Sequence, residues 1–422
     1  MVLARIRVLG SGREVGRAAI LVESDGRGLL LDYGVNFDEM DNPVFPGHVR
    51  PRDLEAVVLT HSHLDHIGAA PGLYVSMAPP LYGTPLTLDV SRLLLYDMIK
   101  LNGPMLPYDE YSVDEMLGGA TSLGYGEEVE AGPFRFKLLD SGHIPGSASV
   151  LVEAGDSRIL YTSDLNNIHT KLVGPAKLDG VKADVVIIES TYGDSNHPPR
   201  EETEDRFYRS VREVVEAGGT VLVPSFSVSR GQELMAILAE RGFEYPVWVD
   251  GMIRQVTELY LAHSGYLARP SLLEEAAMEY RMVRGWQDRR RAYKKPGVII
   301  ASSGMIKGGP SLYYLKKMAT SERNGVFLVS YQAPGTNGRM IIEKGVYGEE
   351  EIPVKARVEW FDFSSHIDQR GILEVLRGII GVSKVVLVHG DPEAQEALRA
   401  RIEEELGLPV ETPGPGDTVE VE

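Results

Sequence analysis

Short runs of apolar residues, separated by glycine, aspartate or asparagine, dominate the first half of the chain. Such runs, rich in valine, isoleucine and leucine and bounded by turn residues, predict strands rather than helices. A longer periodic stretch at about 86–100 predicts one helix among them. The predicted strands cover residues 6–9, 19–22, 28–31, 56–59, 134–137, 148–152, 158–161 and 185–188.

The pattern changes near residue 195, where amphipathic helices begin to alternate with buried strands. This alternation predicts βαβ units and therefore a second, doubly wound parallel sheet. Its helices are expected at 200–217, 230–241 and 252–263, and its strands at 220–224, 246–250, 297–301 and 325–330. The end of the chain is expected to add helices at 369–380 and 392–406 and strands at 384–388 and 418–421.

Composition limits the chemistry that the chain can perform. The 422 residues include ten histidines but no cysteine, which excludes a disulfide scaffold, an iron–sulfur cluster and a cysteine nucleophile. A metal site must therefore use histidine nitrogen and carboxylate oxygen. The net charge of −18 argues against broad adhesion to nucleic acid or anionic membranes, but not against a local positive groove. With no signal peptide and no bilayer-spanning apolar run, we expect a cytoplasmic protein without membrane contact.

The strongest chemical signal is the segment Thr-His-Ser-His-Leu-Asp-His-Ile-Gly at 60–68, which directly follows a predicted strand. Four side chains able to bind metals, His61, His63, Asp65 and His66, fall within six residues. A loop of surface histidines is the plain alternative. We interpret the segment as two half-sites, in which His61 and His63 face one metal ion and Asp65 and His66 face a second.

Further ligands are expected where other predicted strands end. His143 lies in Asp-Ser-Gly-His-Ile-Pro-Gly-Ser, and Asp164, in Tyr-Thr-Ser-Asp-Leu, could bridge two ions. Taken alone, His143 is more often a structural histidine, and Asp164 more often a turn or helix-capping carboxylate. Asp32 also ends a strand, and we expect it to accept the outer N–H of a ligating histidine or to orient the attacking water.

Asp32, the cluster at 61–66, His143 and Asp164 together resemble the motifs of the metallo-β-lactamase superfamily, over roughly the first 190 residues. The resemblance implies an α/β protein built as an αββα sandwich, with metal ions at one edge. Many members of this superfamily are hydrolases that use two zinc ions. The resemblance therefore implies two Zn²⁺ per chain.

Three later segments resemble motifs A, B and C of the β-CASP nucleases: Glu-Ser-Thr-Tyr-Gly at 189–193, Phe-Ser-Ser-His at 363–366 and Leu-Val-His-Gly at 387–390. By this resemblance His389 completes the second metal site, His366 is the general acid that protonates the leaving ribose oxygen, and Glu189 positions His366. Phosphodiester hydrolysis needs a metal-activated hydroxide and a proton donor, and histidine can donate a proton near neutral pH. The expected catalytic residues are Asp32, Asp65, Glu189 and His366.

The third motif also indicates the substrate. In the DNA-processing branch of the β-CASP group the motif C position is typically not histidine, so His389 points to the RNA branch. Within that branch the chain resembles short archaeal and bacterial relatives of the cleavage and polyadenylation endonuclease, and also ribonuclease J. We expect residues 1–194 and 363–422 to form the metallo-β-lactamase domain and residues 195–362 the inserted doubly wound β-CASP domain.

Polar turns in the inserted domain are candidates for RNA binding. Hydroxyl- and glycine-rich segments at 224–233, 301–310 and 335–339 follow or precede predicted elements, and helix N-termini favour phosphate. Each turn alone is a weak signal because glycine and serine interrupt every α/β fold, whereas several at strand ends favour a phosphate-lined cleft. RNA-backbone contacts are expected from Ser225, Arg230, Ser303, Gly304, Lys307 and Arg339.

These features favour a zinc-dependent ribonuclease that cuts RNA internally, with 5′ exonuclease activity left open. One alternative is a non-nuclease metallo-hydrolase on the same scaffold, such as a thioesterase or a glyoxalase-like enzyme. The other is an inactive RNA-binding scaffold subunit. RNA is the expected partner, and a homodimer is left open because relatives often form one.

Overall fold

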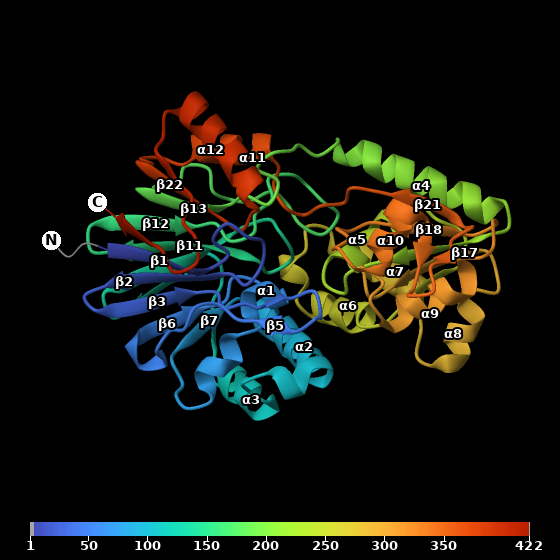
Figure 1. Cartoon of the computed structure of the whole chain (residues 1–422), viewed down its shortest axis with the longest axis horizontal. Helices are drawn as coiled ribbons and strands as arrows, with labels where there is room; N and C mark the ends of the chain where they lie inside the picture. The colour runs from blue at the N-terminus through green and yellow to red at the C-terminus, as the bar shows by residue number, and fades with distance from the viewer. Residues whose placement is uncertain (1–3, 422) are drawn as a thin grey trace. The chain divides into compact units, whose positions relative to one another are not determined.

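The computed structural model describes residues 4–421, which divide into two compact units (Figure 1). Unit 1 comprises the chain up to His169, Gly174–Asn196 and the chain from Ser365 onward. Unit 2 comprises Thr170–Val173 and His197–Ser364. The sequence pattern placed 195–362 in the inserted domain and assigned Thr170–Val173 to the first domain.

Unit 1 contains two seven-stranded sheets. In sheet order, the first comprises β24 (Thr418–Val421), β1 (Ala4–Gly10), β2 (Ala19–Ser24), β3 (Arg27–Leu31), β6 (Leu54–Val58), β7 (Leu81–Gly83) and β8 (Thr121–Ser122). The second comprises β23 (Val410–Glu411), β22 (Lys384–Val388), β13 (Val185–Glu189), β12 (Ser157–Tyr161), β11 (Ala148–Ala154), β10 (Phe134–Asp140) and β9 (Glu128–Ala131). A short hairpin pairs β4 (Asn36–Phe37) with β5 (Pro43–Val44).

Alternation along the strands explains why the two sheets of unit 1 face each other. Inward side chains such as Val22 on β2 and Phe136 on β10 share one core between the sheets. The outward apolar side chains of each sheet pack on helices instead. Helices α2 (Pro85–Asn102) and α3 (Glu110–Gly118) cover the first sheet, and α11 (Gln369–Gly378) and α12 (Pro392–Leu406) the second (Figure 1). The expected αββα sandwich is confirmed.

Unit 2 is built on a six-stranded sheet whose strands are all parallel, which confirms the expected doubly wound sheet. The sheet order is β16 (Arg281–Met282), β15 (Val247–Asp250), β17 (Gly297–Ala301), β14 (Thr220–Pro224), β18 (Gly325–Leu328) and β21 (Arg357–Trp360). Its helices are α4 (Arg200–Glu216), α5 (Arg230–Glu240), α6 (Ile253–Ala262), α7 (Pro270–Glu279), α8 (Trp286–Ala292), α9 (Gly309–Met318) and α10 (Asn337–Lys344). Within residues 4–421, no helix combines the length and apolar character needed to cross a bilayer.

The segment Thr170–Val173 joins unit 2 through buried carboxylates. The backbone N–H groups of Lys171 and Leu172 donate to the carboxylate of Glu233 at 2.9 and 3.1 Å. The Lys171 ammonium lies 2.9 Å from Glu204 and 2.6 Å from Glu240. This network fixes a four-residue piece of chain whose neighbours on both sides belong to unit 1.

A buried ion pair supports the carboxyl edge of the sheet in unit 2. Asp250, at the end of β15, is only 2% exposed and accepts two hydrogen bonds from the Arg289 guanidinium, at 2.7 and 2.8 Å. The Tyr314 hydroxyl donates to the same carboxylate at 2.8 Å. The Asp250 carbonyl in turn accepts from the Ser302 N–H in the loop after β17. The pair therefore anchors a loop that contains candidate RNA-binding residues.

Replacing Arg289 by methionine leaves the Asp250 carboxylate buried without its cation, so we expect unit 2 to lose about 3 kcal/mol of stability. All three tryptophans (Trp248, Trp286 and Trp360) lie in unit 2, so their fluorescence during urea unfolding reports on this unit. Adding Asp250→Asn to Arg289→Met should recover at least half of the loss. The exposed neighbour Arg290→Met serves as the control, with a change within about 0.5 kcal/mol. If the two substitutions instead lower the stability additively in the double variant, the loss in Arg289→Met does not come from the unpaired Asp250 carboxylate.

Candidate metal centre and active site

The His-rich segment lies in unit 1, where the chain leaves β6 and enters α1 (Leu64–Ile67). Asp32, at the end of the neighbouring strand β3, fixes the start of this turn: it accepts hydrogen bonds from the N–H and the hydroxyl of Thr60, both at 2.8 Å. His63 occupies the N-cap position of α1, and Asp65 and His66 lie in its single turn. The end of β6 and the start of α1 thus bring His63, Asp65 and His66 close together in space.

Four predicted ligands converge on a first point. The Nε2 atom of His61 lies 3.1 Å from Nδ1 of His63 and 3.4 Å from Oδ2 of Asp164. Nε2 of His143 lies 3.4 Å from the same His63 atom and 3.5 Å from the same Asp164 oxygen. Ligand atoms around a tetrahedral zinc ion lie about 3.3 Å apart. The spacing of these four atoms therefore suits one such ion.

The remaining predicted ligands converge on a second point beside the first. Nε2 of His66 lies 3.3 Å from Oδ1 of Asp164. Nε2 of His389 lies 3.2 Å from Oδ2 of Asp65, and Nδ1 of His389 lies 3.5 Å from Oδ1 of Asp164. Asp164 therefore presents one carboxylate oxygen to each group.

Unpartnered buried atoms provide a test of whether a cation fits this cluster. His66 and Asp164 are 1% and 2% exposed, and His66 Nε2 and Asp164 Oδ1 lie 3.3 Å apart but lack the geometry of a hydrogen bond to each other or to any other group. Buried polar atoms without partners are rare in native proteins because their desolvation is not compensated. A positive ion between these atoms would satisfy both. The residues therefore fit a metal-binding site.

Hydrogen bonds behind the cluster orient the rings. Nδ1 of His66 donates to Oδ2 of Asp32 at 2.8 Å, and Nδ1 of His143 donates to the Ser365 carbonyl at 2.9 Å. Each bond places Nδ1–H on the outer side of the ring and turns Nε2 toward the cluster. The Tyr161 hydroxyl also donates to Oδ2 of Asp32, at 3.1 Å. These contacts match the first of the two roles expected for Asp32.

Burial and charge set the protonation states in the cluster. Burial lowers the pKa of His61 and of His143 well below the usual value, and that of His63 to about 4. These rings are therefore neutral at pH 7, the form that binds metals. Burial also opposes ionisation of His66 and Asp164, but the Asp164 carboxylate raises the pKa of His66, and His389 and His66 lower the pKa of Asp164. The second half of the cluster thus attracts positive charge.

Glu189 and His366 form a pair at the border of the cluster. Oε2 of Glu189 lies 2.9 Å from Nδ1 of His366, and Oε1 accepts the Leu165 N–H at 2.7 Å. Burial lowers the pKa of His366, but the carboxylates of Glu189 and Asp164 outweigh it and raise the pKa to about 9. Nε2 of His366 lies 3.9 Å from Oδ2 of Asp164. His366 is therefore aimed at the cluster in its protonated form.

The ligand sets overlap at this border. Asp164, Glu189, His366 and His389 also offer four atoms that lie within 4.8 Å of one another. His366 could therefore bind a metal ion or donate a proton. The short contact with Glu189 favours the second role, because a carboxylate on Nδ1 keeps the imidazolium protonated and oriented.

Three residues beside the cluster have left-handed backbone conformations. The φ angles of Asp32, Ser163 and His389 are 59°, 53° and 51°. Non-glycine residues rarely adopt such angles, and those that do are concentrated at functional sites where the surroundings fix them. His389 is fixed by a hydrogen bond from its N–H to the Ser11 carbonyl at 2.7 Å. A side chain at Gly390 would collide with the Ser190 carbonyl, at 2.4 Å.

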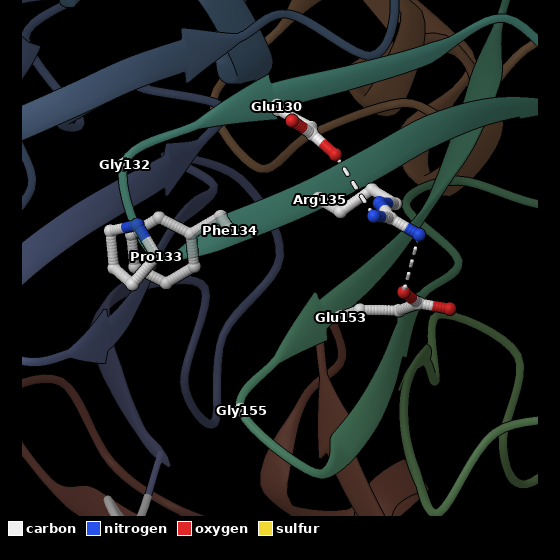
Figure 2. A pocket seen from close by; sticks show the side chains of 7 residues that line it. All are labelled: Glu130, Gly132, Pro133, Phe134, Arg135, Glu153 and Gly155. Carbon is white, nitrogen blue, oxygen red and sulfur yellow. Dashed lines mark hydrogen bonds and ion pairs between the residues drawn. The ribbon is translucent and has the colours of Figure 1, made fainter.

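A shallow surface pocket on unit 1 lies away from this cluster (Figure 2). Arg135 is held there between Glu130 and Glu153, at 2.9 and 3.8 Å. The lining residue Phe134 begins β10, whose opposite end leads into the His143 loop. The pocket and the metal cluster thus occupy opposite ends of the same strand.

The structure places the expected RNA-binding residues in unit 2, mostly near the carboxyl edge of its sheet. Ser225 and Arg230 follow β14, and Ser303, Gly304 and Lys307 follow β17. Ser225 is fully buried, and its hydroxyl donates to the Phe226 carbonyl at 3.2 Å, while Lys307 is exposed. Arg339 lies on α10, where its guanidinium pairs with Glu343 at 2.7 Å.

Sequence reasoning missed the side chains that support the predicted ones. Tyr161 and Ser163 contact Asp32 and Thr60, and the Thr191 hydroxyl donates to Oε2 of Glu189 at 2.6 Å. Thr191 carried a signal, since it lies two positions after Glu189 in motif A. Tyr161 carried none, because a tyrosine at a strand end is more often a packing residue.

Comparison with known proteins agrees with this geometry. Three family models match the chain: the metallo-beta-lactamase superfamily over residues 12–225, the Beta-Casp domain over 232–341, and the Zn-dependent metallo-hydrolase RNA specificity domain over 351–413. A crystal structure from Enterococcus faecalis V583, described as a protein of unknown function, superposes with a TM-score of 0.64 at 14% identity. It covers 99% of this chain and 100% of its own, which shows a shared fold.

Several archaeal proteins are similar over nearly the whole chain. "RNase aCSPSF2" of Saccharolobus solfataricus is 46% identical, over 98% of this chain and 85% of its own. "Probable RNase MJ4" of Methanocaldococcus jannaschii is 34% identical, over 98% and 99%. "Transcription termination factor FttA" of Pyrococcus horikoshii is 35% identical, over 98% and 70%. The chain belongs to the metallo-beta-lactamase superfamily, in the branch of metallo-hydrolases that carry a Beta-Casp domain.

Proposed function

We propose that the protein is a metal-dependent ribonuclease that hydrolyses phosphodiester bonds of RNA in the cytoplasm. The observation that carries this proposal is the convergence of seven metal-ligating side chains beside the Glu189–His366 pair. The names of the archaeal relatives and the RNA specificity model at 351–413 support RNA as the substrate.

We propose two zinc ions as the cofactor. His61, His63, His143 and Asp164 would hold one ion, and Asp65, His66, His389 and the second oxygen of Asp164 the other. Imidazole and carboxylate ligands suit zinc, and the description of the family model at 351–413 supports it. When bound, the ions supply Lewis-acid stabilisation of the phosphoryl oxygens and acidify a water molecule.

The side chains of unit 1 then account for proton transfer in the hydrolysis. Water adds to phosphorus, the bond from phosphorus to the ribose 3′ oxygen breaks, and a proton must reach that oxygen. His366 Nε2 carries this proton because Glu189 holds the opposite side of the ring. Asp32 keeps His66 oriented through the bond to Nδ1. The products are a 5′-phosphate and a 3′-hydroxyl end.

RNA-backbone contacts are proposed for the carboxyl edge of the unit 2 sheet. The exposed Lys307 ammonium and the half-buried Arg230 guanidinium supply charge, and the Ser303 hydroxyl has no hydrogen-bond partner. Gly304 and Ser225 are both buried, and the Ser225 N–H already donates to the Ala301 carbonyl at 2.9 Å, so these two predicted contacts gain no support from the structure. Arg339 contributes only if it leaves Glu343.

The other candidate functions lack support from particular residues. An inactive scaffold does not need a complete ligand set, whereas every predicted ligand is present and converges. A thioesterase does not need a Glu189–His366 pair. Homodimer formation stays a prediction, tested by light scattering of the purified chain.

Replacing His366 by alanine removes the proton donor but no proposed zinc ligand. We expect RNA cleavage to fall by about 10²- to 10⁴-fold while two zinc equivalents remain bound, measured by a radiolabelled cleavage assay and elemental analysis. The exposed His48→Ala variant is the matched control and should cleave at the wild-type rate. Loss of one metal equivalent from the His366 variant would instead identify His366 as a ligand.

Replacing Asp164 by asparagine removes the shared carboxylate charge. We expect at least one of the two zinc equivalents to be lost, because each ion loses half of a bridging anion. Elemental analysis of protein purified without chelators measures this, and circular dichroism checks that the variant is folded. Retention of both ions would refute the bridging role.

The mode of cleavage is tested with one RNA prepared in linear and in circular form. We expect the circular RNA to be cut, because internal cleavage needs no free end. The same preparation should leave a thioester substrate intact. A circular RNA that survives while its linear form is degraded from the 5′ end would replace the endonuclease assignment with an exonuclease.

A further inference from the structure

Three large aromatic side chains are exposed at the carboxyl edge of the unit 2 sheet. Phe226, Tyr331 and Trp360 are 37%, 59% and 46% exposed. Phe226 follows β14, Tyr331 follows β18, and Trp360 ends β21. These three strands are neighbours in the sheet and run in parallel, so the three residues belong to one edge. We call them the aromatic row.

Buried groups beneath the rings connect the three positions of the row. The Phe226 ring lies against Gly304, where an added Cβ would be 3.0 Å from the ring. The Gln332 amide donates to the Gly304 carbonyl at 3.1 Å and to the Ser330 carbonyl at 3.0 Å. The Trp360 indole N–H donates to the same Ser330 carbonyl at 3.3 Å. Tyr331 follows the middle one of the three strands and therefore occupies the middle position of the row.

Cationic side chains accompany the row. Arg230 begins α5, four residues after Phe226, and its guanidinium donates to the Val329 carbonyl at 3.4 Å. Lys307 is exposed in the loop that follows Gly304. The buried residues that connect the rings, Gly304, Ser330 and Gln332, are small or polar rather than aliphatic. Aromatic faces beside cations and small polar groups suit a ligand with flat bases and a phosphate backbone better than an apolar protein surface.

We propose that the aromatic row stacks the unpaired bases of single-stranded RNA, while Arg230 and Lys307 contact its phosphates. This inference rests on the proposed ribonuclease function and specifies the form of its substrate. Neighbouring strands lie about 4.8 Å apart, so three strands span about 10 Å, enough for three bases at about 3.4 Å each. A duplex hides the faces of its bases, so the row selects unpaired RNA.

The test measures binding of a fluorescein-labelled unpaired 12-nucleotide RNA by full-length protein that carries His366→Ala to prevent cleavage. We expect each of Phe226→Ala, Tyr331→Ala and Trp360→Ala to weaken binding by about 5- to 30-fold. Tyr331→Phe and Trp360→Phe keep a stacking face and should restore most of the affinity. Tyr111→Ala on α3, an exposed aromatic outside the row, is the matched control and should bind as the parent does.

Salt dependence separates stacking from electrostatics. The aromatic variants should leave the slope of log affinity against log salt unchanged, whereas Lys307→Ala should reduce it by about 0.7, the value for one phosphate of a single strand. The same RNA annealed to its complement should bind at least 10-fold more weakly than the single strand.

The outcomes distinguish this inference from the proposed function. If the wild-type protein cleaves RNA but all three alanine variants bind RNA unchanged, the stacking role alone is overturned. If these variants bind RNA unchanged but alter the oligomeric state, the row is a protein interface, and the stacking role is again overturned. Equal binding of duplex and single strand would overturn it as well. A wild-type protein that neither binds nor cuts RNA would remove the proposed function and this inference with it.

Discussion

The carboxylate of Asp164 is the constraint on which the centre of unit 1 depends. It is 2% exposed, and its two oxygens face different groups of ligands. An isolated buried carboxylate is costly, so the fold must surround it with positive charge or with bound cations. Strands from distant parts of the chain deliver histidines to both oxygens, and the second layer of hydrogen bonds through Asp32 fixes their direction. The sandwich thus fixes the position of the Asp164 carboxylate.

Much of the fold was predictable because many of its strands have a clear apolar sequence pattern. Apolar runs such as 220–224 and 384–388 match β14 and β22 because both are buried on both faces. Helices α3, α7 and α9 were not predicted, and each spans only nine or ten residues, which gives a short periodic signal. The first described strand pairs with the last, with Ile6 opposite Val419. No local sequence pattern could predict this pairing, because the two strands lie at opposite ends of the chain.

The candidate site was predictable to the extent that its chemistry is concentrated in short motifs. The segment at 60–68 carries four of the predicted ligands, and His143, Asp164 and His389 each lie within three residues after a strand. What could not be predicted is the support supplied from far along the chain. The Ser365 carbonyl that orients His143 is 222 positions away, and the hydroxyl of Tyr161 reaches Asp32 only because β12 and β3 face each other across the core.

The segment Thr170–Val173 has a consequence for how separable the two units are. The chain passes between the units four times, not twice, because this segment enters unit 2 shortly after Asp164 and returns. Residues 197–364 therefore do not form the whole of unit 2, and cutting the chain at these two positions would not remove the unit intact. Removing residues 197–364 would leave Lys171 without Glu204, and a transplanted copy would leave Glu233 without the two N–H donors it now serves. Unit 2 is therefore complete only when it includes residues 170–173.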